Sequence, residues 1–183
     1  TPRRFALTPL GEALKTGAPG SARPSVLTIA GDWWLDGFRE LRYSLETGKC
    51  GFEKALGEPA FDWLAKHPEE ASLFSETMVS FHGSDPAAVA AAYDFSYAQI
   101  IVDAGGATGN LLAAILGKYP ESRGILYDLA HVVREAPALL QARGVADRVT
   151  IESGSFFDQV PVGGDAYLLS HIIHDWSERQ CLT

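Results

Sequence analysis

The sequence of 183 residues predicts an α/β fold, in which a doubly wound parallel sheet is preceded by a mainly helical region. Three observations predict this fold. Up to about residue 97, apolar residues recur at helical spacing. Beyond that point, four short apolar runs alternate with helical patterns, and a glycine-rich segment follows the first run. Strands that alternate with helices at such intervals are typical of a parallel sheet.

The region of residues 1–97 is expected to be helical after a short strand at residues 4–7. Thr8 offers an N-cap oxygen, and Pro9 suits the first position of a helix. Residues 25–45 are predicted as one helix. Its apolar stripe is formed by Trp34, Phe38, Leu41 and Leu45.

Two further helices are expected before the sheet. One begins at Pro68 and carries an apolar stripe that includes Met78 and Phe81, and the other begins at Asp85. Met78 and Phe81 are interpreted as helix core first and as lining of a ligand pocket second. The boundary between the helical domain, residues 1–97, and the α/β domain, residues 98–183, is set by the change in pattern.

Four parallel strands are predicted in the second domain. Each is a short apolar run, and β-branched residues are frequent in the first, as in strands that are buried on both faces. The predicted strands are residues 99–103, 124–128, 148–151 and 166–170, with helices after the first, the second and the fourth.

Composition and charge limit the possible partners. Basic residues number 15 against 23 acidic ones, and the net charge of -8 disfavours nucleic acid. No apolar run reaches the ~20 residues that span a bilayer, so a membrane is not expected. The two cysteines, Cys50 and Cys181, are far apart in sequence, which favours a reducing cytoplasm over a disulfide framework.

Ligands of doubly wound sheets bind beyond the carboxyl ends of the strands. Asp103, Gly105, Gly106 and Gly109 follow the first strand and lead into a helix, whose first amides attract a carboxylate or phosphate. Asp128 ends the second strand and is placed to accept hydrogen bonds from ribose hydroxyls. These residues predict a nucleotide-type cofactor site.

The ends of the third and fourth strands add aromatic and basic groups. Phe156, in the segment from Gly154 through Ser155 to Phe157, could hold an adenine face. The fourth strand is followed by the segment from Ser170 to Trp176, which contains His171 and His174.

Simpler interpretations stay open for each residue. The glycines could serve turn geometry alone, Asp128 could cap a helix, and Phe156 with Phe157 could be core. We expect His171 to pack in a buried strand end. A metal site at the two histidines is disfavoured because zinc needs three or four ligands.

Together, these segments resemble the S-adenosylmethionine-dependent O-methyltransferases of the plant caffeate and flavonoid type and their bacterial relatives in antibiotic biosynthesis. Residues 4–14 resemble the wing strand and next helix of that family's winged-helix dimerisation domain. Residues 102–109 resemble its glycine motif, and residues 128–133 its ribose-binding segment. Residues 174–177, His-Asp-Trp-Ser, match the segment that holds the family's general base.

The resemblance implies a Rossmann-like class I methyltransferase domain that binds S-adenosyl-L-methionine. It implies His174 as general base toward a hydroxyl of a small aromatic molecule, with Met78 and Phe81 beside His174 in the acceptor pocket. It also implies a homodimer formed through the N-terminal region. The implied cofactor-binding residues are Asp103, Gly105, Gly106, Gly109, Asp128, Leu129, Gly154, Ser155, Phe156 and Ser170.

Three positions depart from the family pattern, and part of that pattern would lie beyond this sequence. Ala107 replaces a common glycine, which we expect to cost little. Ser155 stands where an aspartate often lies near adenine, and Ser170 replaces a lysine of the plant enzymes. The last three strands and the acidic residues that orient the histidine would follow Thr183.

Two other functions are weighed. A nicotinamide-dependent oxidoreductase would prefer a Gly-x-Gly-x-x-Gly spacing, which residues 105–109 lack. A non-catalytic regulatory protein is suggested by the winged-helix resemblance, but the acidic charge argues against DNA contact and His174 argues against lost catalysis.

Overall fold

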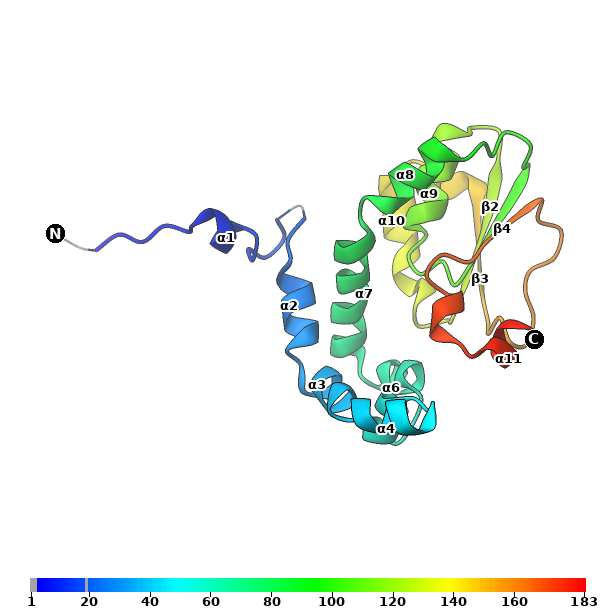
Figure 1. The fold of residues 1–183 in the computed structure, drawn as a ribbon. Coiled ribbons are helices and arrows are strands. Elements are labelled where there is room, and N and C mark those ends of the chain that lie inside the picture. The colour runs from blue at the N-terminus through cyan, green and yellow to red at the C-terminus, as the bar shows by residue number, and fades with distance from the viewer. Residues whose placement is uncertain (1–2, 19) are drawn as a thin grey trace. The chain divides into compact units, whose positions relative to one another are not determined.

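The computed structural model describes residues 3–18 and 20–183, and the chain divides into two compact units (Figure 1). The first unit comprises Thr1–Gly83 and the second Ser84–Thr183. No helix among the described residues is long and apolar enough to cross a membrane.

All regular secondary structure among the described residues of the first unit is helical. Thr8 caps the first helix as predicted, because its side chain accepts a hydrogen bond from the Gly11 N–H at 3.1 Å. The predicted strand at residues 4–7 is wrong, because no neighbouring segment among the described residues pairs with it. The helices are α1 (Pro9–Glu12), α2 (Arg23–Ile29), α3 (Asp32–Arg39), α4 (Leu41–Thr47), α5 (Gly51–Leu56), α6 (Ala60–Lys66) and α7 (Pro68–His82).

The single helix predicted over residues 25–45 is divided among α2, α3 and α4. Gly31, the N-cap of α3, has an extended backbone with ψ 144°, and Glu40 separates α3 from α4 with ψ 12°. The apolar stripe from Trp34 to Leu45 continues across Glu40 and begins only after Gly31, so spacing alone revealed neither break.

Aromatic rings form the interior of the first unit. Trp33 is 9% exposed and stacks on Trp63 with ring centroids 5.4 Å apart. Trp33 also contacts the rings of Phe52 and Phe74. Trp33 therefore packs inside its own unit, whereas Phe38 is 53% exposed.

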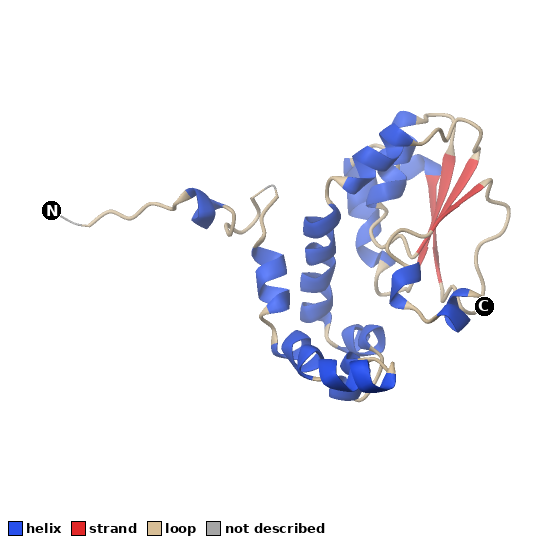
Figure 2. Ribbon diagram, viewed as in Figure 1, coloured by secondary structure: helices blue, strands red, loops and turns tan. Residues whose placement is uncertain are grey.

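The second unit contains a parallel sheet, drawn in red in Figure 2. Its strands are β1 (Ile100–Ala104), β2 (Arg123–Asp128), β3 (Val149–Ser153) and β4 (Ala166–Leu168), in the order β3-β2-β1-β4. This confirms the predicted fold class. The helices are α8 (Asp85–Ala92), α9 (Asn110–Lys118), α10 (Ala136–Ala142) and α11 (Glu178–Cys181), with short 3-10 turns η1 (Val133–Glu135), η2 (Ala146–Arg148) and η3 (Ile173–Asp175).

Helices α8, α9 and α10 lie on one side of this sheet (Figure 1). Ile101 and Leu126 of the strands and Leu112 and Leu116 of α9 are fully buried in a shared core. Ala90 of α8 belongs to the same core. The second unit therefore begins at Ser84 rather than at residue 98, because α8 packs with the α/β region.

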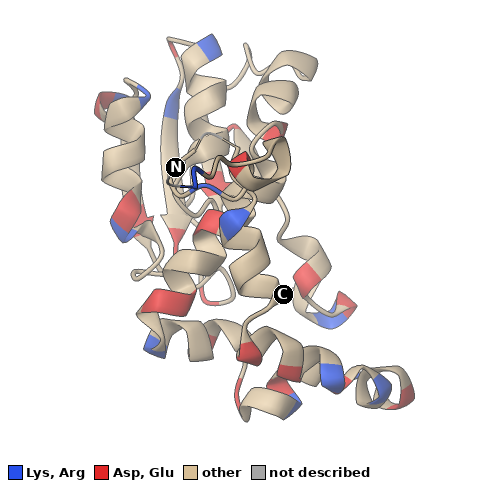
Figure 3. Ribbon diagram, turned by 90° about the vertical axis from the view of Figure 1, so that its left-hand side faces the viewer, with Lys and Arg blue, Asp and Glu red and all other residues tan. Residues whose placement is uncertain are grey.

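Acidic and basic residues share the same elements and are not segregated on the ribbon (Figure 3). In the first unit, Arg42 pairs with Glu46 at 2.7 Å, and Lys54 pairs with Glu40 at 2.6 Å. These pairs are solvent-accessible, so each contributes little to stability.

Candidate functional site

The loops after β1, β3 and β4 converge at the carboxyl edge of the sheet. β2 and β3 extend the sheet on one side of β1, and β4 returns to its other side, so the strand order reverses there. Gly105 marks the meeting point, because an added Cβ would collide with Ile172 and lie 3.6 Å from Phe156. The three predicted segments are thus brought together.

The glycines of the first loop serve its geometry. Gly105 and Gly109 have φ values of 75° and 80°, which favour glycine. The Gly105 N–H donates to the Tyr127 carbonyl at 2.8 Å, which ties the loop to the end of β2. A Cβ on Gly106 would strike the carboxyl group of Asp103. The glycine pattern is therefore explained in part by packing within the loop.

Ala107 adopts the left-handed backbone region with φ 49°. We expected alanine at this position to cost little, but its Cβ makes that conformation unfavourable by about 1 kcal/mol. The conformation places the Ala107 N–H 2.9 Å from Oδ2 of Asp128, to which it donates. The loop after β1 is therefore bonded directly to the carboxylate at the end of β2.

Asp103 is a buried carboxyl group at the base of this loop. It is 1% exposed, and neither of its oxygens makes a hydrogen bond of normal geometry within residues 3–18 and 20–183. Burial raises its pKa to about 7 and the nearby charge of Asp128 acts in the same direction, whereas the nearby Leu112 backbone N–H opposes the rise. A cation placed beside this carboxyl group would stabilise its ionised form, so the site is suited to a cationic partner.

Asp128 accepts two backbone hydrogen bonds, from Ala107 and from Leu129 at 2.7 Å. Burial raises its pKa, and these two bonds oppose the rise. A carboxylate has about four lone-pair sites, so further hydroxyl groups can be accepted. The cap residue of η1 is Val132, which excludes Asp128 from that capping role.

The segment after β3 brings an aromatic cluster to the site. The Gly154 N–H donates to the Asp128 carbonyl at 3.1 Å, and the Tyr127 hydroxyl donates to the Ser155 carbonyl at 3.1 Å. Phe156 lies against Phe157 with ring centroids 4.8 Å apart. Trp176, in the loop after β4, contacts both rings. The sequence did not indicate this contact.

The two histidines after β4 are both accessible. His174 is 64% exposed at its side chain, and its Nε2 lies 3.5 Å from Oδ1 of Asp175. Burial raises the pKa of Asp175, and the neighbouring His174 and His171 act in the opposite direction. Ser170, expected at the cofactor, is exposed in the same loop.

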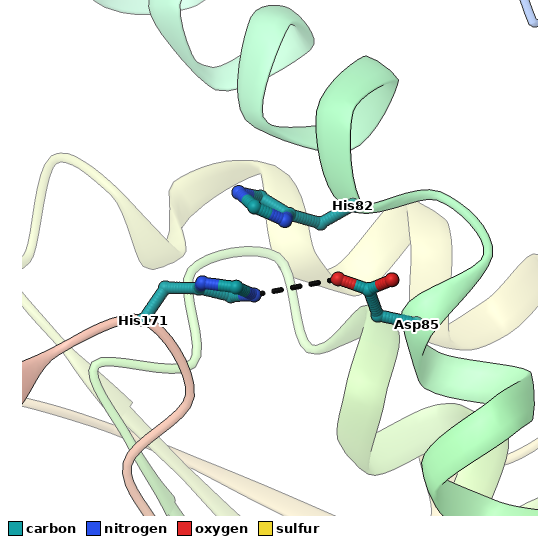
Figure 4. A group of neighbouring side chains, drawn as sticks. All are labelled: His82, Asp85 and His171. Atoms are coloured by element: carbon teal, nitrogen blue, oxygen red, sulfur yellow. Dashed lines mark ion pairs between the residues drawn. The ribbon is translucent and has the colours of Figure 1, made fainter.

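His171 does not pack in a strand end as expected. β4 ends at Leu168, and His171 lies in the following turn with φ 58° and a side chain 41% exposed. Its Nε2 lies 3.4 Å from Oδ2 of Asp85 at the start of α8, as Figure 4 shows. Sequence reasoning missed this role of Asp85, because nothing in the pattern connects residues so far apart.

Met78 and Phe81 belong to α7 of the first unit. Met78 is partly buried, and Phe81 is 50% exposed. Both interpretations made from the sequence, helix core and pocket lining, stay predictions.

This sheet and its converging loops define a Rossmann-like domain of the kind that binds a nucleoside cofactor at a switch point. The chain belongs to the O-methyltransferase family, because residues 38–183 match the model of its O-methyltransferase domain.

Three similar proteins illustrate the family. The chain is 39% identical over 99% of its length to phenazine O-methyltransferase PhzM of Lysobacter antibioticus, covering 53% of that protein. It is 40% identical over 99% of its length to 3-amino-4-hydroxybenzoate 4-O-methyltransferase of Streptomyces cremeus, covering 49%. The O-methyltransferase NcsB1 from neocarzinostatin biosynthesis, solved with S-adenosylmethionine and 2-hydroxy-5-methyl naphthoic acid, matches with TM-score 0.82 and 31% identity over 93% of this chain and 53% of that one.

These matches confirm the family resemblance drawn from the sequence motifs. The chain spans about half the length of the curated relatives that it matches.

Proposed function

We propose that the complete protein transfers a methyl group from S-adenosylmethionine to a hydroxyl group of a small aromatic molecule. The observation that carries this proposal is the convergence of a buried acid, a strand-end carboxylate and an accessible histidine at one edge of the sheet. Those groups are Asp103, Asp128 and His174. The named activities of the relatives support the same function. They include methyl transfer to a hydroxybenzoate, so aromatic hydroxy acids belong to the proposed acceptor class.

The residues at this edge fit such a cofactor. Asp103 has two buried oxygens that make no hydrogen bond of normal geometry in the described part of the chain, and it suits the cationic methionine portion of the cofactor. Asp128 retains lone pairs for ribose hydroxyls. When bound, S-adenosylmethionine supplies a methyl group activated by a positively charged sulfur. The proposed binding residues are Asp103, Gly105, Gly106, Gly109, Asp128, Leu129, Gly154, Ser155, Phe156 and Ser170.

His174 is proposed to take the proton of the acceptor hydroxyl. A phenol has a pKa of about 10 and is a poor nucleophile at neutral pH until a base removes its proton. Imidazole titrates near neutral pH and is therefore suited to this transfer. His174 is exposed at the switch point, so an acceptor can reach it. Met78 and Phe81 are proposed to line the acceptor pocket with it.

Two wider proposals accompany the activity. We propose a homodimer formed through the first unit as a winged-helix-type dimerisation region, supported by the exposed apolar residues Leu10, Phe38 and Leu45. We also propose a cytoplasmic location, supported by two free, exposed cysteines, Cys50 and Cys181.

Two substitutions in the complete protein separate binding from catalysis. Asp128→Ala removes a ribose partner and should weaken S-adenosylmethionine binding by about 10–100-fold. His174→Ala should reduce kcat by about 10²–10⁴-fold with cofactor affinity nearly unchanged. Calorimetric titration with S-adenosylmethionine, with NAD in parallel, measures the first effect. Single-turnover methylation of phenolic acceptors measures the second.

The two variants serve as controls for each other. A full rate in His174→Ala would exclude this base, and unchanged affinity in Asp128→Ala would remove that residue from the site. Binding of NAD in place of S-adenosylmethionine would overturn the proposed function and favour an oxidoreductase.

A further inference from the structure

The segment that carries the proposed base is held by two side chains four residues apart. Ile172 and Trp176 are partly buried. The three residues between them, Ile173, His174 and Asp175, are exposed. His174 thus lies midway between two side chains that pack against the rest of the unit. The position of its imidazole therefore depends on what Ile172 and Trp176 contact.

Ile172 packs against the glycine loop that follows β1. A Cβ added to Gly105 would collide with the Ile172 side chain, so the two residues are in direct contact. The same Cβ would lie 3.6 Å from a ring carbon of Phe156, which belongs to the loop after β3. Gly105 and Phe156 are both proposed cofactor-binding residues. On this side, the segment of His174 therefore rests on the cofactor site.

Trp176 packs against the aromatic pair of the loop after β3. Its ring centroid lies 4.7 Å from that of Phe157, with planes inclined by 87°. It lies 5.9 Å from that of Phe156, with planes inclined by 79°. Both are edge-to-face contacts at distances that aromatic rings favour. Because Phe156 is proposed to hold the adenine face, Trp176 connects the base to the adenine side of the cofactor site.

The 3-10 turn η3 connects these two side chains through the backbone. The Asp175 N–H donates to the Ile172 carbonyl at 3.1 Å. The Trp176 N–H donates to the Ile173 carbonyl at 3.4 Å. His174 lies inside this hydrogen-bonded turn. A shift of Trp176 therefore moves the imidazole with it.

We propose that Trp176 is a positioning residue, which holds His174 at the acceptor hydroxyl by fixing the η3 turn on the loop after β3. This inference rests on the proposed methyltransferase function and adds a residue to it. Trp176 acts through His174 rather than on the acceptor. Because the base rests on cofactor-binding loops, the methyl donor and the base are placed by one set of contacts. A misplacement of about 1 Å can cost about 10²-fold in rate, so this contact matters for proton transfer.

The test compares an acceptor that needs a base with one that does not. The first is a hydroxybenzoate whose hydroxyl group is protonated at the assay pH. The second is the same molecule with a nitro group beside the hydroxyl, which is then already ionised. The complete protein is assayed at saturating S-adenosylmethionine, so that cofactor affinity does not enter kcat. Relative to wild type, Trp176→Ala should lower kcat for the protonated acceptor by about 10–100-fold and leave kcat for the ionised one nearly unchanged.

His174→Ala is the reference for this selectivity. It removes the base itself, so it should show the same difference between the two acceptors, with a larger loss for the protonated one. Trp176→Phe keeps an aromatic ring against Phe157 and should restore most of the lost kcat. Rescue by this conservative variant separates the aromatic contact from other effects of the alanine substitution.

Phe157 provides an independent route to the same perturbation. Phe157→Leu removes the ring on which Trp176 packs, so it should show the selectivity of Trp176→Ala. The double variant should lose little more than Trp176→Ala alone, because both residues act through one contact. If Trp176→Ala does not fold, Phe157→Leu carries the comparison. Tyr93→Ala is the matched control, because Tyr93 is a half-exposed aromatic residue before β1 that contacts Phe95, and both rates should stay unchanged.

The possible failures are distinguishable. An equal loss of kcat with both acceptors in Trp176→Ala would overturn the inference, because it would show that Trp176 supports the fold or the cofactor rather than the base. An unchanged rate with the protonated acceptor would overturn it as well. Equal losses in His174→Ala would exclude the base and this inference with it. If the wild-type protein methylates no phenolic acceptor, the proposed function itself is overturned.

Discussion

The buried carboxyl group of Asp103 makes stability depend on pH in a direction opposite to that of a salt-bridged acid. Its pKa is about 7 in the folded protein, against an ordinary value of 3.8. Below about pH 4, both the folded and the unfolded state hold the proton. Between about pH 4 and 7, the unfolded state loses the proton while the folded state keeps it, so stability falls as pH rises. Above about pH 7, the loss is complete.

The size of the effect follows from the two pKa values. Their difference, at about 1.4 kcal/mol for each pH unit, corresponds to about 4 kcal/mol over the whole range. About 2–3 kcal/mol of that loss falls between pH 5 and pH 8. Asp103→Asn has nearly the same shape and no titration. The variant should therefore gain stability relative to wild type by this amount as pH rises.

Urea unfolding followed by circular dichroism, without cofactor, at pH 5, 6, 7 and 8 measures this difference. Asp128 and Asp175 also have raised pKa values, but they are common to both proteins and largely cancel in the comparison. Asp147→Asn, at an exposed aspartate of η2, is the matched control and should follow wild type. If the free-energy difference between Asp103→Asn and wild type is the same at pH 5 and pH 8, the buried acid does not titrate as described.

Two other predictions concern strain and assembly. Ala107→Gly should stabilise the protein by about 1 kcal/mol because glycine accepts φ 49°, whereas Gly109→Ala should destabilise it because its φ is 80°. Urea unfolding at fixed pH measures the stability of both variants. A loss of stability in Ala107→Gly would refute the strain argument. The complete protein should be a dimer by light scattering at micromolar concentration. Phe38→Asp should weaken the dimer while the buried Trp33 remains packed. A monomeric wild-type protein would contradict the proposed dimer.

The sequence was most informative where one pattern determines both an element and its neighbours. The apolar run at residues 99–103 and the glycines after it predicted β1 and its loop within one residue, because few other structures use that combination. The convergence of Asp128 with this loop followed from the rule for parallel sheets. Patterns that combine strand, turn and helix signals therefore located the site.

The sequence was least informative where tertiary contacts decide the outcome. The stripe that includes Trp34 and Phe38 did not show that the chain breaks at Gly31, because it begins only after that residue. The same stripe continues through the break at Glu40. The Asp85–His171 pair joins positions from α8 and the loop after β4, and no local pattern encodes it. The left-handed backbone at His171 was equally hidden, since no glycine or asparagine marks that turn.

The energetically unfavourable features of the second unit lie at one edge of its sheet. Among the described residues, the non-glycine positions with positive φ are Ala107 and His171, and both lie in loops that follow the adjacent strands β1 and β4. The buried Asp103 carboxyl lies below the first of these loops. Such costs persist only where the surrounding structure determines the conformation, and here the core around Leu112 and Leu126 does so. Natural sequences depart from local preferences mainly at functional sites. A cationic cofactor bound at this edge would offset the cost of the buried Asp103 carboxyl group. Asp103→Asn should therefore give a protein that is more stable at neutral pH and binds S-adenosylmethionine more weakly.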